Sequence, residues 1–178
     1  NEDHRANRTR QWEAMLPAAP WRQRRRALIE LFEGIAPTYD RLNRILSLGI
    51  DSAWRARAAR EVTVKAASGI VVDLASGTGD QVVALLRRSP RLTVLRLDLS
   101  AALLTRAARK LDGVARAGSI RPAPPVVAEM ERLPIRGGSC DAVTMAFALR
   151  HVEGLDSLMA ACAHALRTGG VVAFVDMA

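Results

Sequence analysis

The sequence predicts an α/β fold in which helices flank a mostly parallel sheet. In the second part of the chain, short apolar strand patterns alternate with helical patterns, as in strands joined by helical crossovers. A branched apolar run at 70–72 leads to Asp73, a glycine turn and a helical pattern at 81–86, the order found in nucleotide-binding folds. Acids also follow later strands, at Asp98 and Glu129, so we expect them to gather at the carboxyl edge of the sheet, where ligands bind.

Three segments are predicted along the chain. Residues 1–21 form a basic arm, residues 22–66 a helical cap and residues 67–178 the α/β core, with 22–178 as one structural domain. No apolar run is long enough to span a bilayer and the N-terminus lacks the apolar segment of a secretory signal. A cytoplasmic protein is therefore expected.

Charge and cysteine usage narrow the function only partly. The formal net charge of +8 is compatible with nucleic acid, anionic lipid or an acidic small molecule. The arginines of the arm, with Trp12 and Trp21, predict peripheral contact with an anionic membrane surface, and the alternative is a solvated arm docked by its tryptophans. Cys140 and Cys162 lie among apolar neighbours without metal-ligand spacing, so both are expected to be small buried residues and no metal site is expected.

The local patterns place the individual elements. In the cap, helices are expected at 22–32, ending at Gly34, at 38–48, and at 51–66 with Trp54 and Val62 inward and the arginines outward. In the core, Ser100 is expected to cap a helix and Gly169-Gly170 to end one. The core strands are expected at 70–72, 92–97, 126–127, 141–147 and 171–175, the helices at 81–86, 100–111 and 155–166, and a long loop at 112–125.

The glycine turn predicts the kind of ligand. Gly77 and Gly79 allow a tight turn that brings backbone N–H groups against a ligand at a helix N-terminus. Asp98, about twenty residues further on, is placed to accept hydrogen bonds from both hydroxyls of a ribose, and the alternative is a helix N-cap. Val82 stands where the dinucleotide fingerprint has its third glycine, which favours a single nucleoside over a dinucleotide.

Residues near the second acid suit an adenine. Glu129 or its neighbouring amides would meet the adenine edge and Met130 or Leu99 would cover its face, whereas the alternative for Glu129 is a solvated strand-end acid. S-adenosylmethionine adds a carboxylate and an amine that suit the amides and carbonyls of the turn. Asp73 is expected to orient this turn or to meet the ammonium group through water.

Six motifs occur in a specific order along the chain. They are YDRLN at 39–43, LS at 46–47, WR at 54–55, DLASGTGD at 73–80, AFALRH at 146–151 and LRTGG at 166–170. Over about residues 32–178 they resemble the ubiquinone/menaquinone biosynthesis C-methyltransferase family. The likeness is specific because generic methyltransferases share only the part that begins near residue 71.

The resemblance implies a Rossmann-like class I methyltransferase fold and S-adenosylmethionine as cofactor, with S-adenosylhomocysteine as product. It also implies methyl transfer to a ring carbon of a lipophilic quinol precursor such as demethylmenaquinol. Tyr39 would close over the methionine end of the cofactor and Arg150 would face the ring and stabilise a phenolate. The candidate cofactor-binding residues are Tyr39, Asp73, Ala75, Gly77, Thr78, Gly79, Asp98, Leu99, Glu129 and Met130, and the candidate catalytic residues are Tyr39, Arg150 and His151.

Departures from the family pattern fall mostly on the substrate side. The family's AFGLRN reads AFALRH here, so the usual asparagine is His151, a candidate general base with an ordinary pKa near 6.5 and, alternatively, a structural hydrogen-bonding residue. The other departures are Asp51 for a usual histidine, Arg96 for glycine, Glu129 for aspartate, Thr168 for proline, and Asp176-Met177-Ala178 for Glu-Phe-Ser. Methyl transfer is therefore better supported than the quinol acceptor.

Other functions remain open at this point. Family members continue into a further helix and an antiparallel strand pair, which we expect to be absent here; an open sheet edge would favour a partner strand, as in a homodimer. A paralogue could use another small aromatic or lipid-like acceptor. A nucleic-acid methyltransferase is disfavoured because AFALRH lacks an Asn/Asp-Pro-Pro-aromatic tetrad, so no nucleic-acid partner is expected. A non-catalytic cofactor-binding or scaffold subunit is the alternative outside the enzymes.

Overall fold

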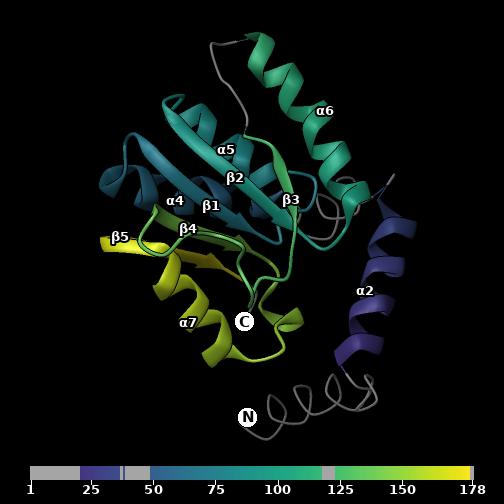
Figure 1. Ribbon diagram of the computed structural model, residues 1–178. Coiled ribbons are helices and arrows are strands. Elements are labelled where there is room, and N and C mark those ends of the chain that lie inside the picture. Colours follow the sequence, from purple (N-terminus) through teal and green to yellow (C-terminus); the bar gives the residue numbers. More distant parts are fainter. Residues whose placement is uncertain (1–20, 37, 39–48, 118–122, 177–178) are drawn as a thin grey trace, which may run out of the picture.

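The computed structural model describes residues 21–36, 38, 49–117 and 123–176. Among these residues two helices precede the sheet, and strands then alternate with helices, except that the fourth strand follows the third without a helix between them (Figure 1). The elements are α2 Trp21–Ile35, α4 Ile50–Lys65, β1 Gly69–Leu74, α5 Asp80–Arg88, β2 Leu92–Asp98, α6 Ala101–Ala117, β3 Pro125–Val127, β4 Cys140–Ala146, the 3-10 turn η1 Leu149–His151, α7 Leu155–Ala165 and β5 Leu166–Val175.

The described strands form one parallel sheet in the order β3-β2-β1-β4-β5. β1 lies at the centre and pairs with β2 on one side and β4 on the other, and the register sets Asp73 beside Thr144. The predicted parallel α/β fold is confirmed. Because all strands run the same way, their carboxyl ends meet at one edge, where the turns after β1, β2 and β4 come together.

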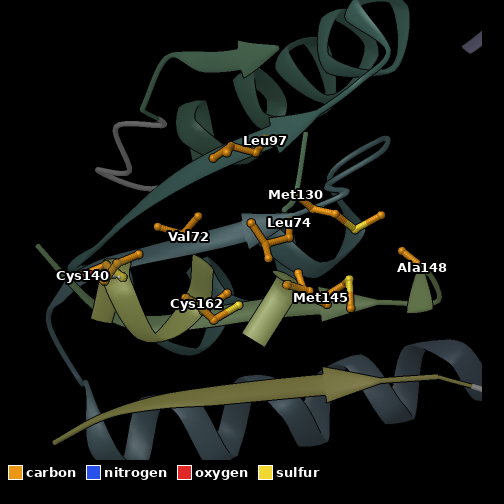
Figure 2. Packing of buried hydrophobic residues seen from close by; sticks show 11 residues of the cluster. Val72, Leu74, Leu97, Met130, Cys140, Met145, Ala148 and Cys162 are labelled. Carbon is orange, nitrogen blue, oxygen red and sulfur yellow. Dashed lines mark hydrogen bonds between the residues drawn. The ribbon is translucent and has the colours of Figure 1, made fainter. Parts of the chain in front are cut away.

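Helices cover both faces of the sheet. Side chains of α4, α5 and α6 pack against one face, around Val71 and Val94. α7 and the segment after β3 pack against the other face, which Figure 2 shows around Val72, Leu74 and Leu97. The adjacent residues Val71 and Val72 thus belong to different faces, which explains why these strands read as continuous apolar runs.

The two cysteines and helix α4 test the predicted core. Cys140 and Cys162 are fully buried free thiols in the α7-side core, which confirms their role as small buried residues. Val62 of α4 is buried as expected, but Trp54 is 39% exposed and Arg55 only 9% exposed. The prediction that Trp54 points inward and Arg55 outward was therefore wrong. Ala58, Ala59 and Val62 define the buried stripe of α4, and one turn towards the N-terminus this stripe reaches Arg55.

Several predicted boundaries differ from those observed because glycines do not stop these elements. α2 continues through Gly34, and α6 continues through Gly113 to Ala117, so residues 112–117 are helix instead of loop. Each glycine leaves open space where a Cβ would stand, and the apolar period of α6 carries on to Val114, which packs on the core. Packing of that period outweighs the cost of one helical glycine, roughly 1 kcal/mol.

The last helix also ends earlier than expected. α7 stops at Ala165, and β5 already begins at Leu166 opposite Cys140. The ladder is then irregular until Val171 pairs with Ala142, and Gly169 takes a left-handed φ of 80° in between. The glycine pair therefore lies within an irregular strand instead of ending the helix.

α2 stands apart from the other helices, beside α6 and the carboxyl edge of the sheet (Figure 1). The helix expected at 38–48 falls outside the described residues apart from Thr38, and the basic arm before Trp21 also lies outside them. Among the described helices, none has the length and apolar character needed to cross a membrane.

Candidate functional site

The turn after β1 builds the centre of the site. Ala75, Gly77 and Gly79 all take left-handed φ angles, of 47°, 53° and 84°. The amide of Ser76 donates to the carbonyl of Leu97 at 2.8 Å, which fastens the turn to β2. A left-handed alanine is unfavourable, and such strain is concentrated at functional sites. The turn is therefore held in one conformation at a cost in local stability.

Gly79 is required for a second reason. A Cβ on Gly79 would lie 3.1 Å from the Cβ of Ala107 in α6. The turn and α6 are therefore in direct contact, and the predicted need for glycine here is explained by packing as well as by φ.

Asp98 ties the ends of β1 and β2 together. Its Oδ2 accepts a hydrogen bond from the amide of Gly77 at 2.7 Å, and its Oδ1 accepts one from the amide of Ser100 at 2.8 Å. The hydroxyl of Ser100 accepts the amide of Leu103, so Ser100 caps α6, as expected, and Asp98 is not its N-cap. Burial raises the pKa of Asp98, while its bonds to the backbone amides oppose that rise. Each carboxylate oxygen has a further lone pair for a ligand.

Asp73 lies beneath the turn and is 1% exposed. Its Oδ1 accepts the hydroxyl of Thr144 at 2.6 Å, while its Oδ2 has no hydrogen-bond partner among the described residues. Burial raises its pKa to about 6, although the Thr144 hydroxyl, the nearby Ser76 hydroxyl and the charge of Arg55 act in the opposite direction. An unpaired buried carboxylate oxygen is costly and indicates a place for a cationic or N–H-bearing ligand group.

Asp73→Asn tests this cost through stability. Because folding raises the pKa of Asp73 from 3.8 to about 6, the folded chain holds this proton more tightly than the unfolded chain. Its contribution to stability is therefore fully present below about pH 4 and is lost as pH rises to about 6. We therefore compare the free energy of unfolding of Asp73→Asn with that of the natural chain at pH 4 and at pH 7. Between these pH values the difference should shift by up to about 3 kcal/mol in favour of the variant.

Urea unfolding at both pH values measures this difference, and Asp156→Asn, at an exposed acid of α7, is the control. A natural chain that gains stability between pH 4 and pH 7 relative to Asp73→Asn would contradict the expectation.

A pocket opens above the turn. The carboxyl edge of the sheet forms its floor, and the apolar side of α2 forms a wall. It is lined by Trp21, Leu28, Ile29, Phe32, Ala75, Gly77, Leu97, Asp98, Leu99, Ser100, Leu103, Ala128, Met130, Glu131, Ala146, Phe147, Ala148 and His151. The predicted residues Ala75, Gly77, Asp98, Leu99, Met130 and His151 thus share one pocket.

The contribution of α2 was missed by the sequence analysis. Trp21, Leu28, Ile29 and Phe32 line the pocket from one face of this helix. Their spacing of seven, one and three residues is a helical period, so an amphipathic face was visible in the sequence. The surface that this face covers was not visible, because it comes from residues far along the chain.

Glu129 is held at the rim by two arginines. Arg25 of α2 pairs with its Oε1 at 2.9 Å, and Arg132 lies 3.6 Å from its Oε2. It does not line the pocket, unlike its neighbours Ala128 and Met130. The Arg25 pair joins α2 to the segment after β3 across the pocket mouth.

The segment after β4 carries the candidate catalytic pair. Phe147 has a left-handed φ of 63° and its amide donates to the carbonyl of Val175 at 2.7 Å. Arg150 is exposed and donates from Nη2 to the carbonyl of Phe147 at 3.0 Å, so it points back to the loop and does not line the pocket. His151 lines the pocket, and its ring and that of Phe32 form a T-shaped pair with centroids 5.5 Å apart. Burial, and then the charge of Arg150, lower the pKa of His151 below 6.5.

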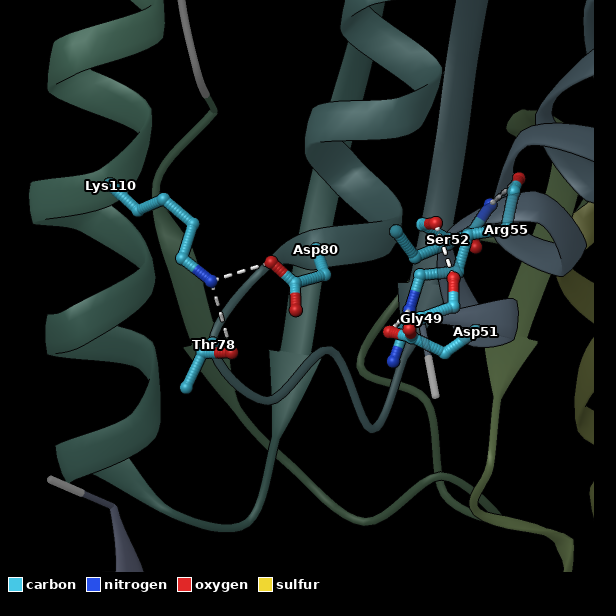
Figure 3. Close-up of polar contacts among 8 residues, drawn as sticks. Gly49, Asp51, Ser52, Arg55, Thr78, Asp80 and Lys110 are labelled. Atoms are coloured by element: carbon cyan, nitrogen blue, oxygen red, sulfur yellow. Dashed lines mark hydrogen bonds and ion pairs between the residues drawn. The ribbon is translucent and has the colours of Figure 1, made fainter. Parts of the chain in front are cut away.

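A buried cation lies behind Phe147. The guanidinium of Arg55 sits 4.8 Å from the centre of the Phe147 ring. Oδ2 of Asp51 lies 3.7 Å from Nε of Arg55, and Figure 3 shows these two residues near the start of α4. Both charged residues are buried near the start of α4. Asp51, a departure from the family pattern, thus balances Arg55 here.

The remaining predicted residues have other surroundings. Thr78 is buried, and its hydroxyl accepts a hydrogen bond from Lys110 of α6 at 3.3 Å (Figure 3). Tyr39 lies outside the described residues. The site therefore combines a fixed glycine turn, an acid that retains acceptor capacity and an apolar pocket, as a nucleoside ligand requires.

Comparison with known proteins agrees with this geometry. The ubiE/COQ5 methyltransferase family matches residues 22–178. A ubiquinone/menaquinone biosynthesis C-methyltransferase of Syntrophotalea carbinolica is 39% identical over 140 residues, which are 79% of this chain and 56% of that protein. A demethylmenaquinone methyltransferase of Thermotoga maritima is 34% identical over 84% of this chain and 61% of that protein. The chain thus spans about three fifths of the length of these relatives.

Solved structures share the fold. A putative S-adenosyl-L-methionine-dependent methyltransferase of Methanococcus maripaludis superposes with a TM-score of 0.64 at 17% identity, over 80% of this chain and 63% of that one. A geranyl diphosphate methyltransferase in complex with S-adenosylmethionine gives a TM-score of 0.58 at 23% identity, over 67% of this chain and 46% of that one. The sheet and its helices have the Rossmann-like fold of class I methyltransferases, and the chain belongs to the ubiE/COQ5 methyltransferase family.

Proposed function

We propose that the chain binds S-adenosylmethionine and methylates a ring carbon of a quinol precursor such as demethylmenaquinol. The observation that carries the proposal is the meeting of the glycine turn, Asp98 and His151 in one apolar pocket. Family membership supports both the cofactor and the acceptor class.

The described residues fit this cofactor. The free lone pairs of Asp98 accept the ribose hydroxyls, and Leu99 and Met130 pack against the adenine faces. Glu129, steadied by Arg25, or the amides beside it meet the adenine edge. The unpaired Oδ2 of Asp73 suits an ammonium group above the turn. When bound, S-adenosylmethionine supplies an electrophilic methyl group on a sulfonium.

On the proposed acceptor side, apolar side chains of the described residues surround the imidazole of His151. Phe32, Phe147 and Ala148 line it together with His151. Because the pKa of His151 is lowered, its imidazole is neutral near pH 7 and accepts the phenolic proton of the quinol. Loss of that proton makes the ring carbon nucleophilic, and the apolar walls would position the ring for methyl transfer. The methylated carbon would then lose its own ring proton to solvent as the ring regains its aromaticity, with S-adenosylhomocysteine as the leaving product. A lipophilic tail fits the apolar side of α2 at the pocket wall.

Two further residues have proposed roles in the reaction. Arg150 stabilises phenolate charge once its side chain leaves the carbonyl of Phe147. Tyr39 closes over the methionine end. A cytoplasmic location, contact of the basic arm with the membrane surface and a homodimer also stay predictions.

Turnover of methyl-labelled S-adenosylmethionine tests the proposal. The natural chain is incubated with demethylmenaquinol and, separately, with several soluble phenols. We expect label in the extracted quinol and much less in the phenols. Label in a phenol alone would replace the quinol by another acceptor, and cofactor binding without any transfer would contradict the proposed activity.

A further inference from the structure

Lys110 reaches from α6 to the turn that the proposed function assigns to the cofactor. Its Nζ lies 2.6 Å from Oδ1 of Asp80 and 3.3 Å from the hydroxyl oxygen of Thr78, and Figure 3 shows this side chain bridging the two elements. All three side chains are partly or fully buried. Lys110 is one of two lysines in a chain whose other basic side chains are mostly arginines. Its side chain carries a compact ammonium group on a flexible stem, whereas an arginine would present a planar fork of donors.

Asp80 lies in the first turn of α5, where an acid can interact with the helix N-terminus. It is the first residue of α5, and an acid there ordinarily accepts hydrogen bonds from the exposed N–H groups of the first turn or is drawn to their partial positive charge. Within the described part of the chain, no side chain caps the N-terminus of α5. The Oδ1 of Asp80 is paired instead with the Nζ of Lys110.

The same face of α6 shapes the turn at a second point. Ala107 precedes Lys110 by three residues, so the two lie on one face of the helix. A Cβ on Gly79 would meet the Cβ of Ala107 at 3.1 Å. Ala107 thus packs closely against Gly79, while Lys110 binds Thr78 and Asp80, the residues before and after Gly79 in the sequence.

α6 is also fixed to the ribose-binding acid. It begins directly after Ser100, whose amide donates to Asp98, and Asp98 in turn accepts the amide of Gly77. The turn, Asp98 and Lys110 are therefore parts of one connected polar arrangement around the proposed cofactor site.

We propose that Lys110 is a positioning residue for cofactor binding. It neutralises Asp80 and keeps the first N–H groups of α5 available to the carboxylate end of S-adenosylmethionine, and it fixes the conformation of the turn through Thr78. This role rests on the proposed function, because it concerns the affinity of that cofactor.

Calorimetric titration with S-adenosylmethionine tests the proposal. We expect Lys110→Met to weaken binding about tenfold, because the freed carboxylate of Asp80 competes for the N–H groups and repels the cofactor carboxylate. Lys110→Arg is expected within about threefold of the natural affinity, since the charge is kept. Lys65→Met, at the exposed other lysine, is the matched control and should bind like the natural chain.

The double variant separates positioning from simple loss of packing. Adding Asp80→Asn to Lys110→Met should restore affinity to within about threefold of the natural chain, because the competing charge is gone. Asp80→Asn alone should also bind within about threefold, and this measurement remains informative where Lys110→Met does not fold. A tenfold loss in Asp80→Asn alone, no rescue in the double variant, or natural affinity in Lys110→Met would each overturn the role of Lys110. Absence of binding by the natural chain would instead overturn the proposed function.

Discussion

We expect His151→Ala to lower the turnover number for quinol methylation by roughly 100- to 10,000-fold, the usual contribution of a general base. His151 lines the pocket beside Phe32, and its lowered pKa keeps the imidazole neutral, so the loss should fall on the chemical step. Turnover and the affinity for S-adenosylmethionine are measured separately. The affinity for S-adenosylmethionine should change little, because His151 is not among the residues proposed to bind the cofactor.

The pH dependence gives a second view of the same residue. In the natural chain, turnover should rise with pH through a value below 6.5 as the imidazole loses its proton. This rise should disappear in His151→Ala. Arg150→Ala, which removes the neighbouring exposed cation, is the matched variant and should keep the rise. Full turnover in His151→Ala together with its loss in Arg150→Ala would contradict the assignment of the base to His151.

Asp98→Ala is expected to weaken the binding of S-adenosylmethionine by about 100-fold or more. The variant loses the acceptors for two ribose hydroxyls, and hydrogen bonds to a charged group contribute roughly 1.5–3 kcal/mol each. It also leaves the amides of Gly77 and Ser100 without the carboxylate that now holds them. Calorimetry measures the affinity, and thermal melting shows whether the variant stays folded.

Asp98→Asn is the graded control. Its side chain keeps one acceptor oxygen in place of two, so one of the two backbone amides remains satisfied. We expect an affinity between those of the natural chain and Asp98→Ala. Equal affinities in the natural chain and Asp98→Ala would place the ribose elsewhere.

The parts of the site predicted from sequence are those built by local chain order. Asp98, Ser100 and the glycine turn follow strands directly, so the patterns that mark them lie within a few residues of one another in the sequence. These patterns are the strand ends, the Ser100 helix cap and the glycines that take left-handed φ angles. The parallel sheet follows from the same alternation of strands and helices.

The parts that were missed depend on contacts between distant residues. The wall that α2 forms over the pocket, and the capture of Glu129 by Arg25, join residues about a hundred positions apart. Arg55 was expected to be exposed because arginine usually is, yet Asp51 and the Phe147 ring hold its charge in a buried position. No local pattern indicates which partner such a charge will find.

Hydrogen–deuterium exchange with and without S-adenosylmethionine tests the central claim most directly, because the claim places the cofactor between the glycine turn and α2. We predict slower exchange on binding in residues 75–80, 98–103 and 128–131, and along α2 at Trp21–Ile35. The amides of α7, none of whose residues lines the pocket, should be unchanged. Unchanged exchange in both the turn and α2 while the cofactor is bound would contradict this placement.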